Sequence, residues 1–485
     1  MAQISSVRPC SIVPPYLLEA LAQHADASIA DLARRSLDQD RHLRHTRTAS
    51  PPRTSSTSDH PVEHLAGLAA PHVDDGHSPQ RTIADAHVTQ TTPGTTVRRE
   101  GAPASGDPAV DEAYDGFGQT WALYHDVFGR DSLDNRGLPL LGTVHYGANY
   151  DNAFWDGTQM VFGDGDGTVF QRFTIAVDVI GHELTHGVTE YTAALDYQGQ
   201  SGALNESVSD VFGSLVKQRA LGQSATDADW LIGEGLFTPA VHGVALRSMK
   251  APGTAYDDPH LGRDPQPATM AGYVQTTDDN GGVHLNSGIP NHAFQLAATA
   301  IGGQAWEGAG QIWYDVLTGG RIPHDCDFAT FATATLAAAE KRFGAGSAQA
   351  VAVGDAWNQV GVAVGSAPVG SAPVGSSPAG SGGAAAPGGS VDQAVLRLRR
   401  SGGLAGIPQE RTVALDDLPD PDAHDWRDLL AGDGLNLLAA EPQQRSVPDA
   451  FVYHVAYPPD GDEVTVSEHG IPEAVRTLFQ RTLGA

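Results

Sequence analysis

A stretch with neither charged residues nor a core-forming pattern divides this chain in two. Residues 364–390 (VGSAPVGSAPVGSSPAGSGGAAAPGGS) repeat a five-residue unit of small residues and proline. Such a segment buries too little apolar surface to fold and behaves as a flexible linker. The chain has 485 residues, which at roughly 150 residues per domain allows about three folded units. We therefore expect a domain boundary at this linker.

Both sides of the linker are predicted to be α+β units. Residues 81–363 begin with strand-like segments punctuated by Gly, Asn and Asp, as far as Phe173, and continue with helical periodicity to Val362. Residues 391–485 suggest two hairpins, VLRLRR with ERTVAL and FVYHVAY with EVTVSE, and two helices, AHDWRDLLAG and PEAVRTLFQRTL. We can assign no catalytic motif in this second unit.

The N-terminal 80 residues differ from both units. Residues 1–40 hold an apolar patch, IVPPYLLEALA, and a predicted helix, SIADLARRSL, whereas residues 41–80 are rich in Ser, Thr, Pro, His and Arg and suggest an exposed tether. We find neither a readable signal peptide nor an apolar run long enough to span a membrane. We therefore expect synthesis in the cytoplasm and no membrane insertion, with a non-classical route for any export.

The charge balance excludes several partners. The 29 Lys and Arg face 58 Asp and Glu, giving a formal net charge of −29, so nucleic acid and acidic membrane surfaces would be repelled. With only Cys10 and Cys326, the chain has no disulfide framework.

The most specific chemical signal is the sequence HELTH in a helical stretch. His182 and His186 lie one turn apart on one helix face, close enough to bind one Zn²⁺, and Glu183 lies beside them as a candidate base. The helical segment GALNESVSDVFGSLVKQ follows and places Glu206 and Asp210 on one face. An antiparallel second helix could supply Glu206 as third ligand and Asp210 as the acceptor that orients a ligand imidazole. Two His, one Glu and a water are the open arrangement of catalytic zinc.

Five motifs in order resemble the thermolysin family of metalloproteases: NAFWDGTQMVFGDGDG, HELTH, NESVSD, ALRSM and DNGGVHLNSG. The similarity extends over about Arg81–Val362. It implies a β-rich N-terminal lobe, a helical C-terminal lobe, and a cleft between them that the HELTH helix crosses.

The resemblance also implies residue roles. His182, His186 and Glu206 would be the zinc ligands, with Asp210 and Asn205 supporting them, and Glu183 would take a proton from the zinc-bound water. His284 and Tyr197 match donors to the developing oxyanion, with Asp279 orienting His284. Asn152, Ala153 and Arg247 match contacts to the substrate backbone. The pocket for the residue after the scissile bond would be entirely apolar, so we expect cleavage before Leu, Phe, Ile or Val; it would be lined by Phe170, Phe173, Val179, Ile232, Leu236 and Leu246.

One departure from the family concerns calcium. Asp178, Asp229 and Glu234 remain of a paired calcium site, but Lys217 and Leu231 occupy two of the matching positions. Because an ammonium can replace the charge of a cation but cannot ligate calcium, we expect one weakened calcium site or none.

The flanking segments resemble regulatory elements. PCSIVPPYLLEALA is similar to the short precursor segment of protealysin-like members of the family, which makes residues 1–40 a propeptide and residues 41–80 a cleavable segment. Cys10 could fill the fourth zinc position as a thiolate or could be a passive apolar residue.

Residues 391–485 resemble emfourin, a small protein inhibitor of protealysin-like proteases. This implies an inhibitory domain, and a substrate-targeting module and an inert stabilising domain remain alternatives. The main hypothesis is thus a zinc endopeptidase made as a zymogen that acts on proteins or peptides. A catalytically silent regulatory or binding protein on the same scaffold, with a targeting tail, is the competing one.

Overall fold

The computed structural model describes residues 10–48 and 78–364, together with parts of the C-terminal region: 395–402, 409–415, 418, 426, 429–430, 451–456, 463–467 and 473–484. The described residues fall into two compact units, one up to residue 364 and the other from residue 395 onward. Both are α+β units, as expected. The linker beyond Val364 and most of the predicted tether lie outside the described residues.

A six-stranded sheet forms one side of the first unit, with strand order β1-β5-β6-β4-β2-β3. Strand β4 pairs in parallel with β2 and β6, and the other pairs are antiparallel. Strands β4, β5 and β6 are wholly buried, whereas β3 alternates between exposed and half-buried residues. The strands are β1 (Cys10–Ser11), β2 (Thr82–Asp85), β3 (Thr95–Arg99), β4 (Leu141–Val144), β5 (Ala153–Trp155) and β6 (Met160–Phe162).

Helix α4 (Pro108–Ala122) packs against this sheet. Its start is specified locally, since Asp107 accepts a hydrogen bond from the amide of Ala109 and Pro108 occupies the first turn. Phe117 from its buried face lies directly over Gly142 of β4, where an added Cβ would come within 2.8 Å of the ring. A single-turn π-helix, η1 (Leu123–Val127), follows α4.

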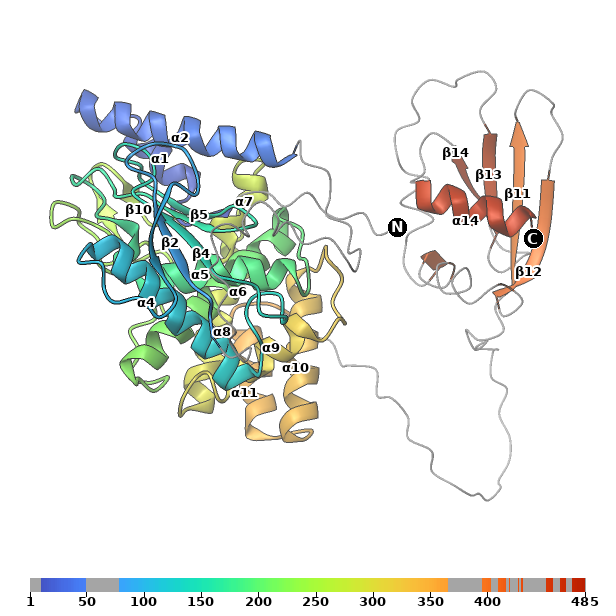
Figure 1. Ribbon diagram of the computed structural model, residues 1–485. Helices are drawn as coiled ribbons and strands as arrows, with labels where there is room; N and C mark the ends of the chain where they lie inside the picture. Colours follow the sequence, from blue (N-terminus) through green and yellow to red (C-terminus); the bar gives the residue numbers. More distant parts are fainter. Residues whose placement is uncertain are drawn as a thin grey trace. The chain divides into compact units, whose positions relative to one another are not determined.

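Helices make up most of the remainder of the first unit (Figure 1). Helix α6 is buried over most of its length because it lies between α5 and α7–α9. The helices are α5 (Val177–Glu190), α6 (Gly199–Leu221), α7 (Asp279–Asn286), α8 (Gly288–Ile301), α9 (Ala309–Thr318), α10 (Phe328–Phe343) and α11 (Ala348–Gln359). Shorter elements are η2 (Phe173–Ile175), β7 (Leu231–Ile232), β8 (Arg247–Ser248), β9 (Asp257–Asp258), β10 (Gly262–Arg263) and η3 (Met270–Gly272).

The N-terminal segment packs onto the same unit as two helices, α1 (Pro15–Leu21) and α2 (Ala27–Thr48), drawn in blue in Figure 1. Leu17, Leu18 and Leu37 are buried in the main hydrophobic core of the first unit. Helix α2 continues to Thr48, beyond the boundary predicted near residue 40. The polar composition that suggested a tether there does not interrupt the helix, because Arg and His are tolerated in helices.

The C-terminal unit confirms both predicted hairpins. Its sheet has strand order β12-β11-β13-β14 and is antiparallel throughout. Trp426 is fully buried, stacks on Phe479 at 5.1 Å between ring centroids, and donates to Thr482 at 2.8 Å. The elements are β11 (Val395–Gly402), β12 (Gln409–Ala414), β13 (Phe451–Ala456), β14 (Glu463–Ser467) and α14 (Glu473–Gly484). Among the described residues of the chain, no helix has the length and apolar character needed to cross a membrane.

Candidate active site

Two closely packed helices bring the site residues together. Gly181 of α5 and Gly213 of α6 let the helices approach, because a Cβ on Gly213 would lie 2.3 Å from the carbonyl oxygen of Asp178. Contacts run in opposite senses along the two helices, with His182 meeting Asp210 and His186 meeting Asn205. The helices are therefore antiparallel, which is the arrangement in which Glu206 and Asp210 can reach the two histidines.

His182, His186 and Glu206 form a buried cluster that can hold a metal ion. Their ligand atoms all lie within 4.8 Å of one another. The Nε2 atoms of the two histidines are 3.0 Å apart, and the carboxylate oxygens of Glu206 lie 3.5 Å from Nε2 of His182 and 3.6 Å from Nε2 of His186.

Hydrogen bonds on the far side of each imidazole fix this arrangement. Nδ1 of His182 donates to Asp210 at 2.7 Å, and Nδ1 of His186 donates to Asn205 Oδ1 at 2.8 Å. The Asn205 amide is oriented in turn by donating to the Leu195 carbonyl at 3.0 Å. Both Nε2 atoms therefore present lone pairs to each other, and lone pairs at 3.0 Å repel unless a cation lies between them. The donor set, two imidazoles and one carboxylate, suits zinc.

Asp210 accepts more hydrogen bonds than the one from His182 that the sequence predicted. Besides His182, it accepts two hydrogen bonds from Arg247, at 2.8 and 2.9 Å, and one from Asn291 of α8 at 2.8 Å. Burial opposes the charged form, but Arg247 and His182 outweigh it and hold the pKa of Asp210 well below its usual value. No sequence motif pointed to Asn291.

Glu183 is fully buried on the same face as the metal cluster. Its Oε2 accepts a hydrogen bond from the backbone amide of Trp155 at 2.9 Å, so strand β5 orients it. Burial and the nearby Glu206 carboxylate raise its pKa well above the usual value. A buried carboxyl group with a raised pKa is suited to accept a proton and pass it on.

His284 and Tyr197 also lie beside the cluster, next to Glu206. Nε2 of His284 lies 3.5 Å from Glu206 Oε2 and 3.3 Å from the Tyr197 hydroxyl, which donates to the other oxygen of Glu206. Asp279 accepts from Nδ1 of His284 at 2.6 Å and from its amide at 2.9 Å. Burial opposes the charge on His284, but Asp279 and Glu206 outweigh it and raise its pKa to about 9.

The DNGG sequence explains how Asp279 reaches back to His284. Positive φ values at four successive residues, from Asp279 to Gly282 (50°, 51°, 83° and 74°), form a left-handed turn at the start of α7. Asn and Gly adopt this region at low cost. The turn folds the Asp279 carboxylate back onto the helix that carries His284.

The N-terminal segment lies across these groups. The Ile12 amide donates to the Ala153 carbonyl at 3.1 Å, and Arg247 donates to the Ile12 carbonyl at 3.0 Å. Asn152 accepts from the Val13 amide at 2.9 Å and donates to the Val13 carbonyl at 3.3 Å. The three residues predicted to bind a substrate backbone therefore bind the N-terminal segment instead. The side chain of Cys10 lies outside the described residues.

Helix α2 also forms hydrogen bonds with the residues around Asn152. No sequence motif indicated these bonds. Asp40 is buried and accepts from the Tyr150 hydroxyl at 2.5 Å and from Asn152 Nδ2 at 3.0 Å. Ser36, one turn earlier, accepts from the Asp151 amide at 3.2 Å. The sequence offered one signal for these contacts, which is that Ser36 and Asp40 lie four residues apart on a helix that also carries apolar residues. Polar pairs with this spacing usually face solvent.

The side chains predicted to line the specificity pocket are all apolar and buried. The side chains assigned to it are each no more than 1% exposed and share one core with Ile12, which is also fully buried. Phe170 and Phe173 lie 5.7 Å apart between ring centroids. The set is Phe170, Phe173, Val179, Ile232, Leu236 and Leu246.

The three carboxylates that remain of the predicted calcium site surround the ammonium group of Lys217. Nζ of Lys217 lies 2.8 Å from Asp229, 2.9 Å from Glu234 and 3.8 Å from Asp178. Burial opposes its charge, but Asp178 and the other two carboxylates raise its pKa above the usual value. Burial raises the pKa of Asp178 to about 6 despite this cation. The Leu231 amide donates to Asp229 at 2.8 Å, so Leu231 contributes backbone to the cluster.

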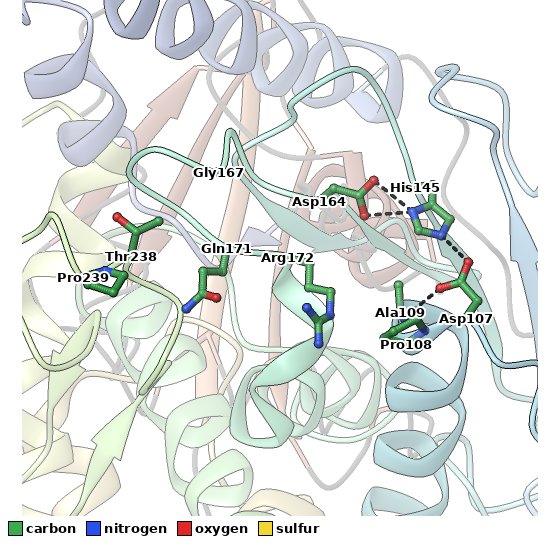
Figure 2. Close-up of a pocket in the computed structure, with 10 residues that line it drawn as sticks. All are labelled: Asp107, Pro108, Ala109, His145, Asp164, Gly167, Gln171, Arg172, Thr238 and Pro239. Atoms are coloured by element: carbon green, nitrogen blue, oxygen red, sulfur yellow. Dashed lines mark hydrogen bonds and ion pairs between the residues drawn. The ribbon is translucent and has the colours of Figure 1, made fainter.

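A pocket of about 540 Å³ lies elsewhere on this unit and is lined by none of these residues. Figure 2 shows His145 between two carboxylates, with Nδ1 2.9 Å from Asp164 and Nε2 2.9 Å from Asp107. The hydrogen bond to Asp164 is the main cause that raises the pKa of His145 to about 9, against burial and with further support from Asp107.

Comparison with known proteins assigns the family. Residues 72–190 match the catalytic domain of thermolysin metallopeptidases, and residues 193–362 match their alpha-helical domain. An extracellular metalloprotease from Pectobacterium carotovorum subsp. carotovorum is 52% identical over 356 residues, which span 73% of this chain and 97% of the relative. This chain belongs to the thermolysin family. It is therefore a zinc-dependent metalloendopeptidase, and a catalytically silent scaffold is not favoured.

Further matches identify the type of thermolysin-family protease. Protease PrtS from Photorhabdus sp. (strain Az29) is 45% identical over 75% of this chain and 94% of its own length. The solved precursor of protealysin, a metalloproteinase from Serratia proteamaculans, is 53% identical with a TM-score of 0.64, over 73% of this chain and 100% of that one. Residues 398–483 match the emfourin family. The chain is thus a protealysin-like protease with a C-terminal emfourin domain.

Proposed function

We propose that this endopeptidase is a zymogen that cleaves before large apolar residues and that its N-terminal segment covers the site until it is removed. One observation carries the proposal: the backbone of Ser11–Val13 is bound by the same groups that would bind a substrate. Residues 1–40 are then the propeptide, and residues 41–80 contain the cleavable segment.

In this proposal His182, His186 and Glu206 hold the zinc, with Asp210 and Asn205 orienting the imidazoles. Bound zinc supplies Lewis acidity and lowers the pKa of a water molecule to about 7. Glu183, held by the Trp155 amide, accepts a proton from the attacking water and delivers it to the leaving nitrogen.

His284 and Tyr197 would donate hydrogen bonds to the carbonyl oxygen as it gains negative charge. Each such donor stabilises a transition state by about 3 kcal/mol. Asp279 keeps His284 oriented and charged. Asn152, Ala153 and Arg247 would align the substrate backbone, and the apolar pocket would accept Leu, Phe, Ile or Val.

Replacing the base tests this mechanism. We expect Glu183→Ala to retain zinc, because the three ligands remain, and to lose casein hydrolysis and self-processing. Metal content and caseinolysis of the purified full chain measure both. Glu307→Ala, at an exposed position away from these residues, is the matched control and should keep activity. Comparable hydrolysis by Glu183→Ala would refute the assignment, and loss of its zinc would mean that Glu183 is a ligand.

The zymogen part is tested at the N-terminus. An active preparation should lack roughly 60–80 N-terminal residues, because exposed polar segments are preferred cleavage sites. N-terminal sequencing decides this, and an intact Met1 or Ala2 on fully active enzyme would rule out the propeptide role. Relatives named extracellular proteases support export of the enzyme, which we propose occurs by a non-classical route.

We also propose that residues 391–485 inhibit the catalytic unit to which they are tethered. If residues 364–390 behave as the flexible linker that their composition predicts, their root-mean-square reach is about 28 Å, and tethering at such a length gives an effective concentration on the order of millimolar. A chain shortened to Ser366 should be more active than the full chain after propeptide removal, and adding the 391–485 fragment should inhibit it. Equal activities with no effect of the fragment would favour a targeting role.

The Lys217 cluster supports the proposal that this enzyme needs little or no calcium. The ammonium supplies the positive charge that calcium would otherwise bring to Asp178, Asp229 and Glu234.

A further inference from the structure

The N-terminal segment enters the site as an added strand. Strand β1 pairs antiparallel with β5, with Cys10 opposite Trp155 and Ser11 opposite Phe154. The Ile12 amide continues the ladder by donating to Ala153 at 3.1 Å. This pairing determines which backbone group meets each side chain of the site.

The register places one peptide bond at the catalytic groups. The Ser11 carbonyl oxygen lies 3.2 Å from Nε2 of His284, the proposed oxyanion donor. The next carbonyl, of Ile12, accepts from Arg247, and the next residue, Val13, is bound through both backbone groups by Asn152. The carbonyl carbon exposed to attack is therefore that of Ser11, and the residue after the bond is Ile12, buried and apolar as the pocket requires.

We propose that this protease hydrolyses the Ser11–Ile12 bond of its own precursor and that the cut propeptide remains bound as an inhibitor. The inference rests on the proposed function. Water adds to the Ser11 carbonyl carbon as the C–N bond breaks, and Glu183 transfers a proton from the water to the Ile12 nitrogen. The second water proton also passes to that nitrogen, so the products are a Ser11 carboxylate and an Ile12 ammonium group. No oxidant or reductant is needed.

The cut does not release the propeptide because most of its described anchors lie after the cut bond. Val13 keeps its two hydrogen bonds to Asn152, and Asp40 keeps those from Tyr150 and Asn152. The apolar side chains that follow the bond, Leu17, Leu18 and Leu37, stay in the core. Burial of apolar surface is the dominant favourable term in association, so these anchors hold the segment without the two residues of β1.

Retention also favours the reverse reaction. The Ile12 amine stays beside the site at a high effective concentration, and reacting groups held in this way rejoin readily. The propeptide would thus exist as a mixture of cut and intact forms, both inhibitory, until the chain is cleaved in the 41–80 segment.

The test follows purified full-length protein over time by intact mass and N-terminal sequencing. A species beginning at Ile12 should form in the wild type and be absent from Glu183→Ala. It should elute with the catalytic unit in size-exclusion chromatography. Ile12→Pro removes the amide that donates to Ala153 and should slow the cut at least tenfold, whereas Ile12→Leu keeps both the amide and a large apolar side chain and is the control.

Two results would overturn the inference. One is hydrolysis of casein with no species beginning at Ile12 at any time, which would leave the proposed function standing. The other is a cut at Ile12 whose propeptide dissociates at once. Failure to hydrolyse either casein or the precursor would instead refute the proposed function, and the inference with it. In metal-free Glu183→Ala, the backbone amides of Ser11–Val13 should still be protected from hydrogen exchange. Rapid exchange of these amides would contradict the pairing of this segment with β5.

Discussion

Two clusters on the α5–α6 pair balance the negative charge of their carboxylates in different ways. In one cluster Glu206 faces His182 and His186, whose lone pairs point at each other, so the cluster requires a cation from outside. In the other cluster Lys217 contacts Asp178, Asp229 and Glu234, so the cation belongs to the chain. One arrangement can exchange its ion and do chemistry, whereas the other can only stabilise.

The His145 cluster is a third solution on the same unit. Its cation is the protonated ring of His145 between Asp107 and Asp164 (Figure 2). The ring loses this charge when the pH rises. The His182–His186–Glu206 cluster thus needs a bound metal, the Lys217 cluster carries its own cation, and the His145 cluster needs a protonated imidazole. Each requirement can be tested separately.

Removal of zinc should have the largest effect. A zinc chelator should abolish proteolysis and lower the free energy of unfolding, by about 4 kcal/mol if zinc had been present at a thousandfold its dissociation constant. Urea unfolding with and without the chelator measures this. A calcium-selective chelator is the control and should change nothing; an equal loss of stability with it would mean that calcium still binds.

Lys217→Met should have the next largest effect. Removing one partner of a buried charge cluster costs about 3–5 kcal/mol, and because two of these carboxylates are partly exposed we expect the lower end. Millimolar calcium should restore part of the stability in this variant only. Exposed Lys250→Met is the control, and equal stabilisation of the wild type by calcium would contradict the comparison.

Asn205→Ala should weaken zinc binding without abolishing it. The variant loses the acceptor for Nδ1 of His186, and such losses typically reduce metal affinity 10–100-fold. Competition with a chelator of known affinity measures the change. Asn358→Ala, on the exposed face of α11, should leave the affinity unaltered, and an unaltered affinity in Asn205→Ala would show that the hydrogen bond does not matter.

His145→Gln should have the smallest effect, and that effect should depend on pH. The folded pKa of about 9 lies above the ordinary value, so the charged ring stabilises fully below about pH 6.5 and loses its contribution as the pH rises through 9. The difference in unfolding free energy from the wild type should be about 1 kcal/mol at about pH 6, reduced by partial solvent exposure, and absent near about pH 10. A difference that is constant with pH would mean that only packing was lost.

The sequence determined those features of this protease that depend on local spacing. Two histidines four residues apart must share one face of a helix, alternating strands must form hairpins, and an uncharged repeat cannot build a core. The cluster of His182, His186 and Glu206 that can hold a metal, the position of Glu183 beside it and the hairpins of the emfourin domain were therefore predictable. The role of Lys217 as a replacement for a calcium ion was predictable as well, because it occupies a position where the family pattern has a calcium ligand.

Only the tertiary structure decided the contacts between distant segments. That Asn291 binds Asp210, that the Trp155 amide holds Glu183, and that Asp40 binds Asn152 follow from helices and strands packing together. The register of Ser11 against His284, 273 residues later in the chain, is of the same kind. Spacing along the chain carries no information about such pairs, because a hydrogen bond between remote side chains exists only after the surfaces that carry them have met.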